Sequence, residues 1–64
     1  MHPERAELSS LSSTLRELAE RITGAAERSD TAKDDALATD LFAVERSLQA
    51  AQRRLSSAVD RLRD

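Results

Sequence analysis

The chain has 64 residues, of which 39% are hydrophobic and one is aromatic, and its net charge at pH 7 is −2. This length allows one domain, residues 1–64, and so small a domain usually needs disulfides, a metal or oligomerisation to supplement its core. Cys is absent, which excludes disulfides, and the single residue His2 argues against a bound metal or another cofactor. Acidic charge and one aromatic side chain argue against nucleic-acid binding. We therefore expect oligomerisation.

The N-terminal residues offer no sign of export or of membrane insertion. Residues 1–5 lack the apolar segment of a signal peptide, and no apolar run approaches the ~20 residues that span a bilayer. We therefore expect a cytoplasmic protein with no membrane contact. Nine of the ten basic residues are Arg, and Ala, Leu, Ser and Asp are abundant. This bias indicates a bacterial source with a high-GC genome.

The first predicted helix covers about residues 3–29. Pro3 suits a first helical turn, and Glu4 and Glu7 complement the positive end of the helix dipole. Apolar residues then recur in alternating steps of three and four, which are the a and d positions of a heptad repeat. They stay in phase through the Ser-rich tract 9–14, so packing rather than helix propensity must hold that stretch. The a and d residues are Leu8, Leu11, Leu15, Leu18, Ile22 and Ala25.

The turn is predicted at about residues 30–32 and the second helix at about residues 33–63. Thr31, with Asp34 three residues later, resembles a capping box, which would place Asp34 and Asp35 in the first helical turn. The second helix shows the same apolar repeat without a break in phase. Its a and d residues are Leu37, Leu41, Val44, Leu48, Ala51, Leu55, Ala58 and Leu62.

Two long heptad-patterned helices joined by a short turn predict an all-α fold, an antiparallel helical hairpin with coiled-coil packing. When the chain is folded about residue 33, each core layer pairs an a residue with a d residue, as in Leu18 with Leu48. The small or apolar e positions form an edge that we expect to face a second hairpin. This bundle edge comprises Ala19, Ala26, Ala38 and Val59.

The predicted assembly is a homodimer that forms a four-helix bundle, with the a and d residues of both helices as its oligomer core. A monomeric hairpin, a larger oligomer and a complex with another protein are the alternatives.

The polar residues do not have the spacing of a catalytic or metal site. The carboxylates of Glu17 and Glu20 each have an Arg one helical turn away, as on a salt-bridged surface rather than in an acid–base pair. The acidic turn around Asp34 lacks the Gly and the bidentate Glu of a calcium loop. The sequence also lacks a Ser/His/Asp or Cys/His set and a phosphate-binding Gly loop. We expect the protein not to be an enzyme.

The remaining candidates are surface residues near the end of the second helix and at one aromatic position. Basic side chains gather in the last third of this helix, where an acidic protein or RNA could bind. Phe42 falls outside the a, d and e positions, where it could pack within the oligomer or anchor a partner. The possible partner surface comprises Phe42, Arg46, Arg53, Arg54 and Arg61.

A polar stripe also runs along the second helix, at Glu45, Gln49, Gln52, Ser56 and Asp60. Its spacing is similar to the E-x3-S-x2-R-x3-Q-x3-D stripe of hairpin anti-sigma factors that bind cyclic di-GMP. Glu45 and Asp60 match by residue type, whereas Gln52 stands where that family has Arg. Size and hairpin architecture also resemble the plasmid copy-control ROP proteins, which dimerise into four-helix bundles and bind RNA loops, but their motifs are absent here.

The sequence thus predicts a non-enzymatic protein–protein interaction or scaffolding module, a self-associating helical hairpin that docks a protein partner. The alternative is a small regulator that binds RNA or a nucleotide through the Arg-rich end of the second helix. Salt dependence separates the two, because phosphate contacts weaken steeply as salt is added.

Overall fold

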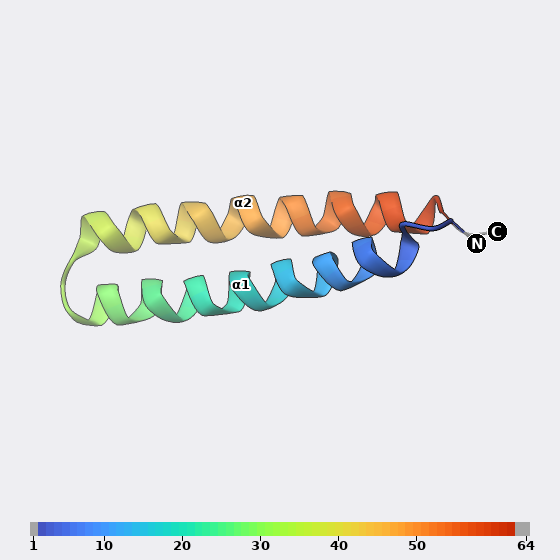
Figure 1. Cartoon of the computed structure of the whole chain (residues 1–64). Helices are drawn as coiled ribbons and strands as arrows, with labels where there is room; N and C mark the ends of the chain where they lie inside the picture. Colours follow the sequence, from blue (N-terminus) through green and yellow to red (C-terminus); the bar gives the residue numbers. More distant parts are fainter. Residues whose placement is uncertain (1, 63–64) are drawn as a thin grey trace.

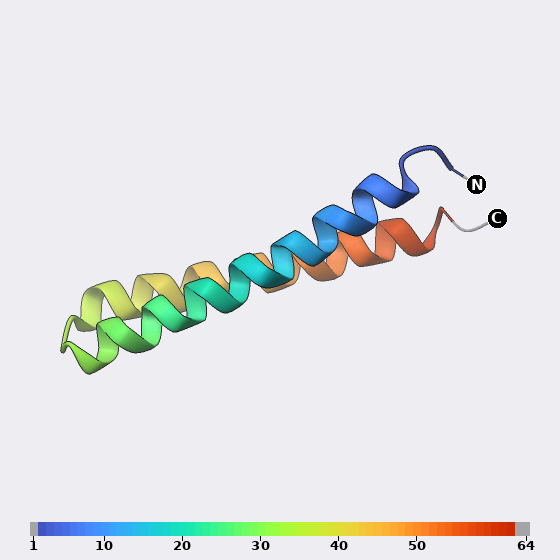
Figure 2. The same cartoon turned by 60° about the horizontal axis from the view of Figure 1, so that its bottom comes forward.

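The computed structural model describes residues 2–62, which form two helices packed side by side in an antiparallel hairpin (Figure 1). Helix α1 spans Arg5–Thr31 and helix α2 spans Asp35–Asp60. The Cα atoms occupy 50 × 14 × 10 Å, so the hairpin is one layer of two helices. Figure 2 shows the helices crossing gently along their length. The predicted all-α hairpin is confirmed over the described residues.

Helix α1 begins at Arg5 rather than at Pro3 because Pro3 and Glu4 form a turn before it. The Nδ1 atom of His2 accepts a hydrogen bond of 3.1 Å from the backbone N–H of Glu4. Glu4 is the N-cap residue, but its side chain makes no capping hydrogen bond. The Ser-rich tract 9–14 is helical throughout, as the phase of the apolar repeat predicts.

The helices are joined by a Schellman motif in which Lys33 adopts the left-handed conformation, with φ 66°. The N–H of Lys33 donates to the carbonyl oxygen of Asp30 at 3.0 Å, and the N–H of Asp34 donates to that of Ser29 at 2.9 Å. These bonds satisfy the last carbonyl groups of α1 and reverse the chain. Helix α1 therefore extends two residues beyond its predicted end, and the connection lies at residues 32–34.

Asp34 is the N-cap of α2, so the predicted capping box with Thr31 as the cap is wrong. The Oδ1 atom of Asp34 accepts a hydrogen bond of 3.2 Å from the backbone N–H of Leu37. Thr31 is instead the last residue of α1. Helix α2 ends at Asp60, and the predicted helix end at residue 63 lies outside the described residues.

Replacing Lys33 with Gly is expected to raise the free energy of unfolding by about 1 kcal/mol. The left-handed conformation costs a residue with a Cβ roughly 1–2 kcal/mol, and Gly adopts it without this cost. Urea unfolding followed by circular dichroism measures the change. Lys33→Ala is the matched control, because it shortens the side chain but keeps the Cβ, and it should bring no gain. A Gly variant no more stable than the Ala variant would contradict this turn.

The contact between the two helices is made by the a and e positions, with the e residues at its centre. Every e residue in the helices is buried or half-buried, and every a residue is half-buried. Ala26 is fully buried, while Ala19 and Ala38 are 6% and 4% exposed. Small side chains at these positions let the two helices approach closely. Ala19, Ala26 and Ala38 of the predicted bundle edge thus lie in the hairpin's own contact, and Val59 is half-buried beside it.

The d positions lie away from this contact, which corrects the predicted pairing of a with d residues inside the hairpin. The large d side chains remain substantially exposed: Leu11 by 43%, Leu18 by 39%, Leu37 by 45% and Val44 by 43%. The physical reason is size, because Ala and Ser at the e positions permit a closer approach than Leu at the d positions. The hairpin therefore closes on its a and e residues and leaves the d residues without an intramolecular partner layer.

Candidate interaction surfaces

The hairpin has two unlike faces. Around an α-helix, the d positions lie on one side of the a and e positions and the b positions lie on the other. The d residues of both helices therefore share one face, which we call the apolar face. It comprises Leu11, Leu18, Ala25, Leu37, Val44, Ala51 and Ala58.

Large and small residues are distributed unevenly over the apolar face. On α1, Leu11 lies toward the open end of the hairpin, Leu18 lies at the middle of the helix and Ala25 lies near the turn. On α2 the order is reversed, with Leu37 and Val44 near the turn and Ala51 and Ala58 toward the open end. The face is therefore a surface of bulky side chains and gaps, which a complementary apolar surface could fill.

The outer border of the apolar face is formed by the g positions, all of which are exposed. We call these residues the charged rim: Glu7, Thr14, Arg21 and Arg28 beside α1, and Asp40, Ser47, Arg54 and Arg61 beside α2. An apolar stripe bordered by charges of both signs is typical of helix–helix interfaces, in which the rim charges select the partner and its orientation.

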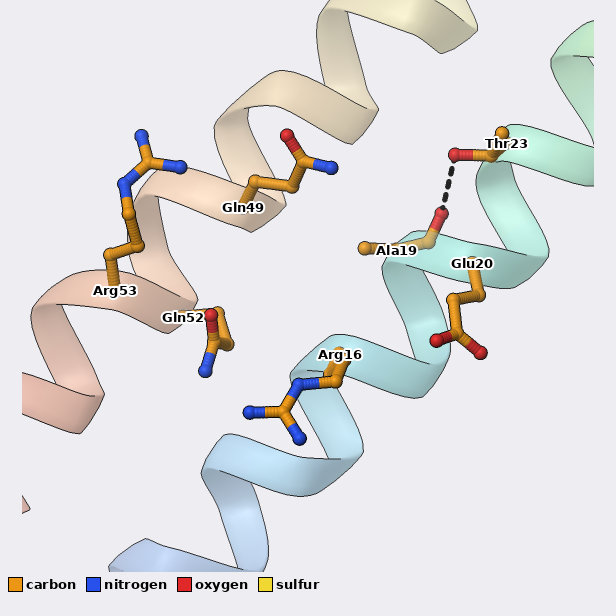
Figure 3. Close-up of a pocket in the computed structure, with 7 residues that line it drawn as sticks. All are labelled: Arg16, Ala19, Glu20, Thr23, Gln49, Gln52 and Arg53. Atoms are coloured by element: carbon orange, nitrogen blue, oxygen red, sulfur yellow. Dashed lines mark hydrogen bonds between the residues drawn. The ribbon is translucent and has the colours of Figure 1, made fainter.

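The opposite face carries a polar groove between the two helices (Figure 3). It encloses about 440 Å³ and is lined by Arg16, Ala19, Glu20, Thr23, Gln49, Gln52 and Arg53. In Figure 3, Arg16 on α1 and Arg53 on α2 lie on opposite sides of Gln52. A second hollow of about 200 Å³ shares Arg16 and is also lined by Ser56 and Asp60.

Hydrogen bonds between the helices fix their relative position. The hydroxyl groups of Ser12 and Ser56 lie 2.9 Å apart, and Nε2 of Gln52 donates to Ser12 at 3.2 Å and to Ser56 at 2.9 Å. Closer to the turn, the Thr23 hydroxyl donates to a carboxylate oxygen of Glu45 at 3.1 Å. Ser12 thus lies opposite the helical turn between Gln52 and Ser56, which agrees with a chain folded about residue 33.

Ser12→Ala should be less stable than Ser13→Ala by about 1 kcal/mol. Both substitutions gain the same helix propensity, but only Ser12 is buried, at 7% exposure, and bonded to Gln52 and Ser56. Ser13 is exposed one residue further along α1. Thermal and urea unfolding of the two variants measure the difference. Equal stabilities would mean that the hydrogen bonds of Ser12 do not stabilise the contact between α1 and α2.

The predicted partner surface is divided between two sides of α2. Arg53, Arg54 and Arg61 line one hollow of about 700 Å³, together with two small residues. Arg46 is exposed but is not one of the residues that line this hollow. Phe42 is half-buried at a b position, which puts it on the same side as the polar groove rather than on the apolar face.

The polar stripe of α2 lies along the groove face. Glu45 bonds to Thr23, Gln49 and Gln52 line the groove, and the last two stripe residues line the second hollow. The sequence contained this signal, because the first four stripe residues occupy b and e positions and Asp60 occupies the neighbouring f position, but it did not identify the α1 residues opposite. At the open end, the buried Nε atom of Arg5 has no hydrogen-bond partner within the described part of the chain.

The described residues show neither a metal-binding cluster nor a helix able to span a membrane. Within residues 2–62, no three His, Cys, Asp or Glu side chains are grouped as they would be around a metal ion. Neither helix combines the length and the apolar character needed to cross a bilayer. Comparison with protein-family models, with curated proteins and with solved structures finds no match.

Proposed function

We propose that this chain is a non-enzymatic protein–protein interaction module that binds through its apolar face, with a second copy of itself as its first partner. The observation that carries the proposal is the exposure of the large d residues on one side of the hairpin, among them Leu18 at 39% and Val44 at 43%. Their heptad spacing matches the spacing of side chains that pack between helices.

The energetics of the isolated hairpin support a partner. Among residues 2–62, the buried hydrophobic residues are three Ala, whose side chains remove little apolar surface from water. Full burial of a Leu side chain contributes about 1.5–3 kcal/mol, and the isolated hairpin realises only part of this at Leu11 and Leu18. A second hairpin laid on the apolar face would complete this burial and produce a four-helix bundle.

The bundle would leave the polar groove on its outer surface, because the groove lies on the opposite face from the d residues. A further protein could therefore dock there without displacing the second copy. Arg16 and Arg53, on opposite sides of the groove, are suited to carboxylate groups of such a partner.

Sedimentation equilibrium tests the proposal directly. We expect a species of twice the 7.1-kDa chain mass, and a melting temperature that rises with protein concentration because association stabilises the folded state. A folded monomer at every concentration would contradict self-association. If that monomer also kept the same melting temperature at all protein concentrations, association would add nothing to its stability. Exposure of the apolar face would then give no energetic reason for a partner.

The Arg-lined hollow favours a second candidate, a small regulator that binds RNA or a nucleotide. Three guanidinium groups around one hollow could contact phosphates, and such contacts weaken as salt increases. Fluorescence anisotropy with labelled RNA at low salt tests this candidate. Binding that is lost in an Arg53→Gln, Arg54→Gln double variant would support it, and absence of binding at low salt would exclude it.

A further inference from the structure

We infer that the polar groove is a carboxylate-binding site in which Arg16 and Arg53 hold an acidic side chain of a partner protein other than this chain. The inference rests on the proposed interaction function and names the chemistry of a second partner. It does not depend on how two copies of the hairpin are arranged, because the groove lies on the face opposite the d residues.

The polar groups at the floor of the groove are already hydrogen-bonded. Nε2 of Gln52 donates to the hydroxyl groups of Ser12 and Ser56. The hydroxyl group of Thr23 donates to a carboxylate oxygen of Glu45. These groups hold the two helices together, so they need no ligand to satisfy them.

The walls of the groove carry donors that have no partner. Arg16 and Arg53 are exposed, and within residues 2–62 neither guanidinium group has a hydrogen bond or an ion pair. Figure 3 shows the guanidinium group of Arg16 directed toward Gln52, whereas the carboxylate of Glu20 is directed away from α2. Glu20 therefore does not occupy these donors. The planar fork of a guanidinium group matches the two oxygens of a carboxylate.

The charge of the groove favours a carboxylate over a phosphate group. Two Arg and one Glu are the charged residues that line it, so its formal charge is +1. A carboxylate carries one negative charge and would neutralise the groove. A phosphate monoester carries about −1.5 to −2 at pH 7, and its excess charge would be repelled by Glu20 and by Glu45 beside Thr23.

The groove is long enough for a segment of a protein chain. It adjoins the second hollow at Arg16, so the walls of the two run along α1 from Ser9 to Thr23. This stretch of helix rises about 21 Å, which is the span of about six residues of extended chain. A small free carboxylic acid would fill only part of this length. An acidic side chain on a protein segment therefore fits both the charge and the length of the groove.

Nuclear magnetic resonance of the Arg side chains tests the inference on the whole chain. The probe is a blocked Gly/Ser peptide of about six residues with one Glu at its centre, and the matched probe has Gln in that place. We expect the Nε–H resonances of Arg16 and Arg53 to shift saturably with the Glu peptide and not with the Gln peptide. The resonance of Arg21, which lies in the charged rim outside the groove, should stay unchanged with both.

Substitutions at Arg16 separate a specific contact from a general effect of charge. Arg16→Gln should weaken binding of the Glu peptide about 10-fold, because a hydrogen bond between charged groups is lost. Arg16→Lys keeps the charge but not the planar fork, so its affinity should lie between the two. Arg21→Gln is the matched control, because it removes the same charge at an exposed position outside the groove, and it should leave the affinity unaltered.

The outcomes separate this inference from the proposed self-association. Absence of shifts at Arg16 and Arg53, or equal shifts with the Gln peptide, overturns the carboxylate site. Tighter binding of inorganic phosphate overturns the choice of ligand, and equally tight binding of free glutarate overturns the protein segment as its source. Sedimentation equilibrium is measured on the same sample. A dimer that binds no peptide leaves self-association intact, and a monomer that binds the Glu peptide supports the groove alone.

Discussion

Ala26→Leu is expected to lower the free energy of unfolding by about 3 kcal/mol, enough to unfold much of a small two-helix protein at low concentration. Ala26 is fully buried in the contact between α1 and α2. A larger side chain there would push apart helices that Ala19 and Ala38 hold close together. Overpacking a tight contact typically costs about 1–3 kcal/mol. The cost should lie at the upper end here, because the two helices cannot accept a larger side chain at Ala26 without moving apart.

Ala43→Leu is the matched control for this prediction. It makes the same substitution at an exposed c position of α2, where the side chain meets no other helix of the hairpin. Its effect should stay within about 0.5 kcal/mol. Circular dichroism during thermal and urea unfolding compares the two variants. If both variants had the same melting temperature, the helices would not meet through their e positions. The result would then favour the contact between a and d residues that the heptad repeat predicts.

The apolar repeat predicted the two helices but not which of their positions are in contact. The repeat established the length of α1 through the Ser-rich tract 9–14 and the phase of α2, because apolar periodicity depends only on helix geometry. Which neighbouring positions face each other depends on side-chain size as well. The sequence did contain a signal for this, since Ser12, Ala19 and Ala26 place a small residue every seven positions along α1.

The turn illustrates a second limit of local patterns. Thr31 and Asp34 are both competent N-cap residues, so the sequence alone could not choose between them. The choice depends on Lys33, whose left-handed conformation ends α1 and presents Asp34 to the next helix. Such a position is usually marked by Gly or Asn, and Lys gives no such mark. The helix boundaries therefore shifted by two residues although the hairpin itself was predicted.

The sequence predicted which residues make up the candidate surfaces better than it predicted where those residues lie in the hairpin. The sequence identified the apolar d residues and the basic end of α2, because both follow from residue type and periodicity. It could not show that the d residues lie outside the hairpin contact, which leaves them on an exposed face rather than in an intramolecular core. Nor could it join Arg16 to Arg53 across a groove, because that depends on the relative position of two helices.

Leu18→Gln is expected to weaken self-association by about 30-fold while the chain remains helical. Leu18 is 39% exposed in the hairpin, so burial of its remaining surface on docking contributes about 1 kcal/mol per copy, or about 2 kcal/mol per dimer. Gln is a good helix former, so the substitution leaves α1 intact. Sedimentation equilibrium over a range of concentrations measures the change in the dissociation constant.

Glu17→Gln is the control, because it introduces the same residue one position earlier at an exposed c position outside the apolar face. Its dissociation constant should match that of the unaltered chain. If Leu18→Gln dimerised equally well, the apolar face would not be the contact between copies. If it dissociated and lost its helices at the same concentration, the expectation that the dissociated chain remains helical would be wrong.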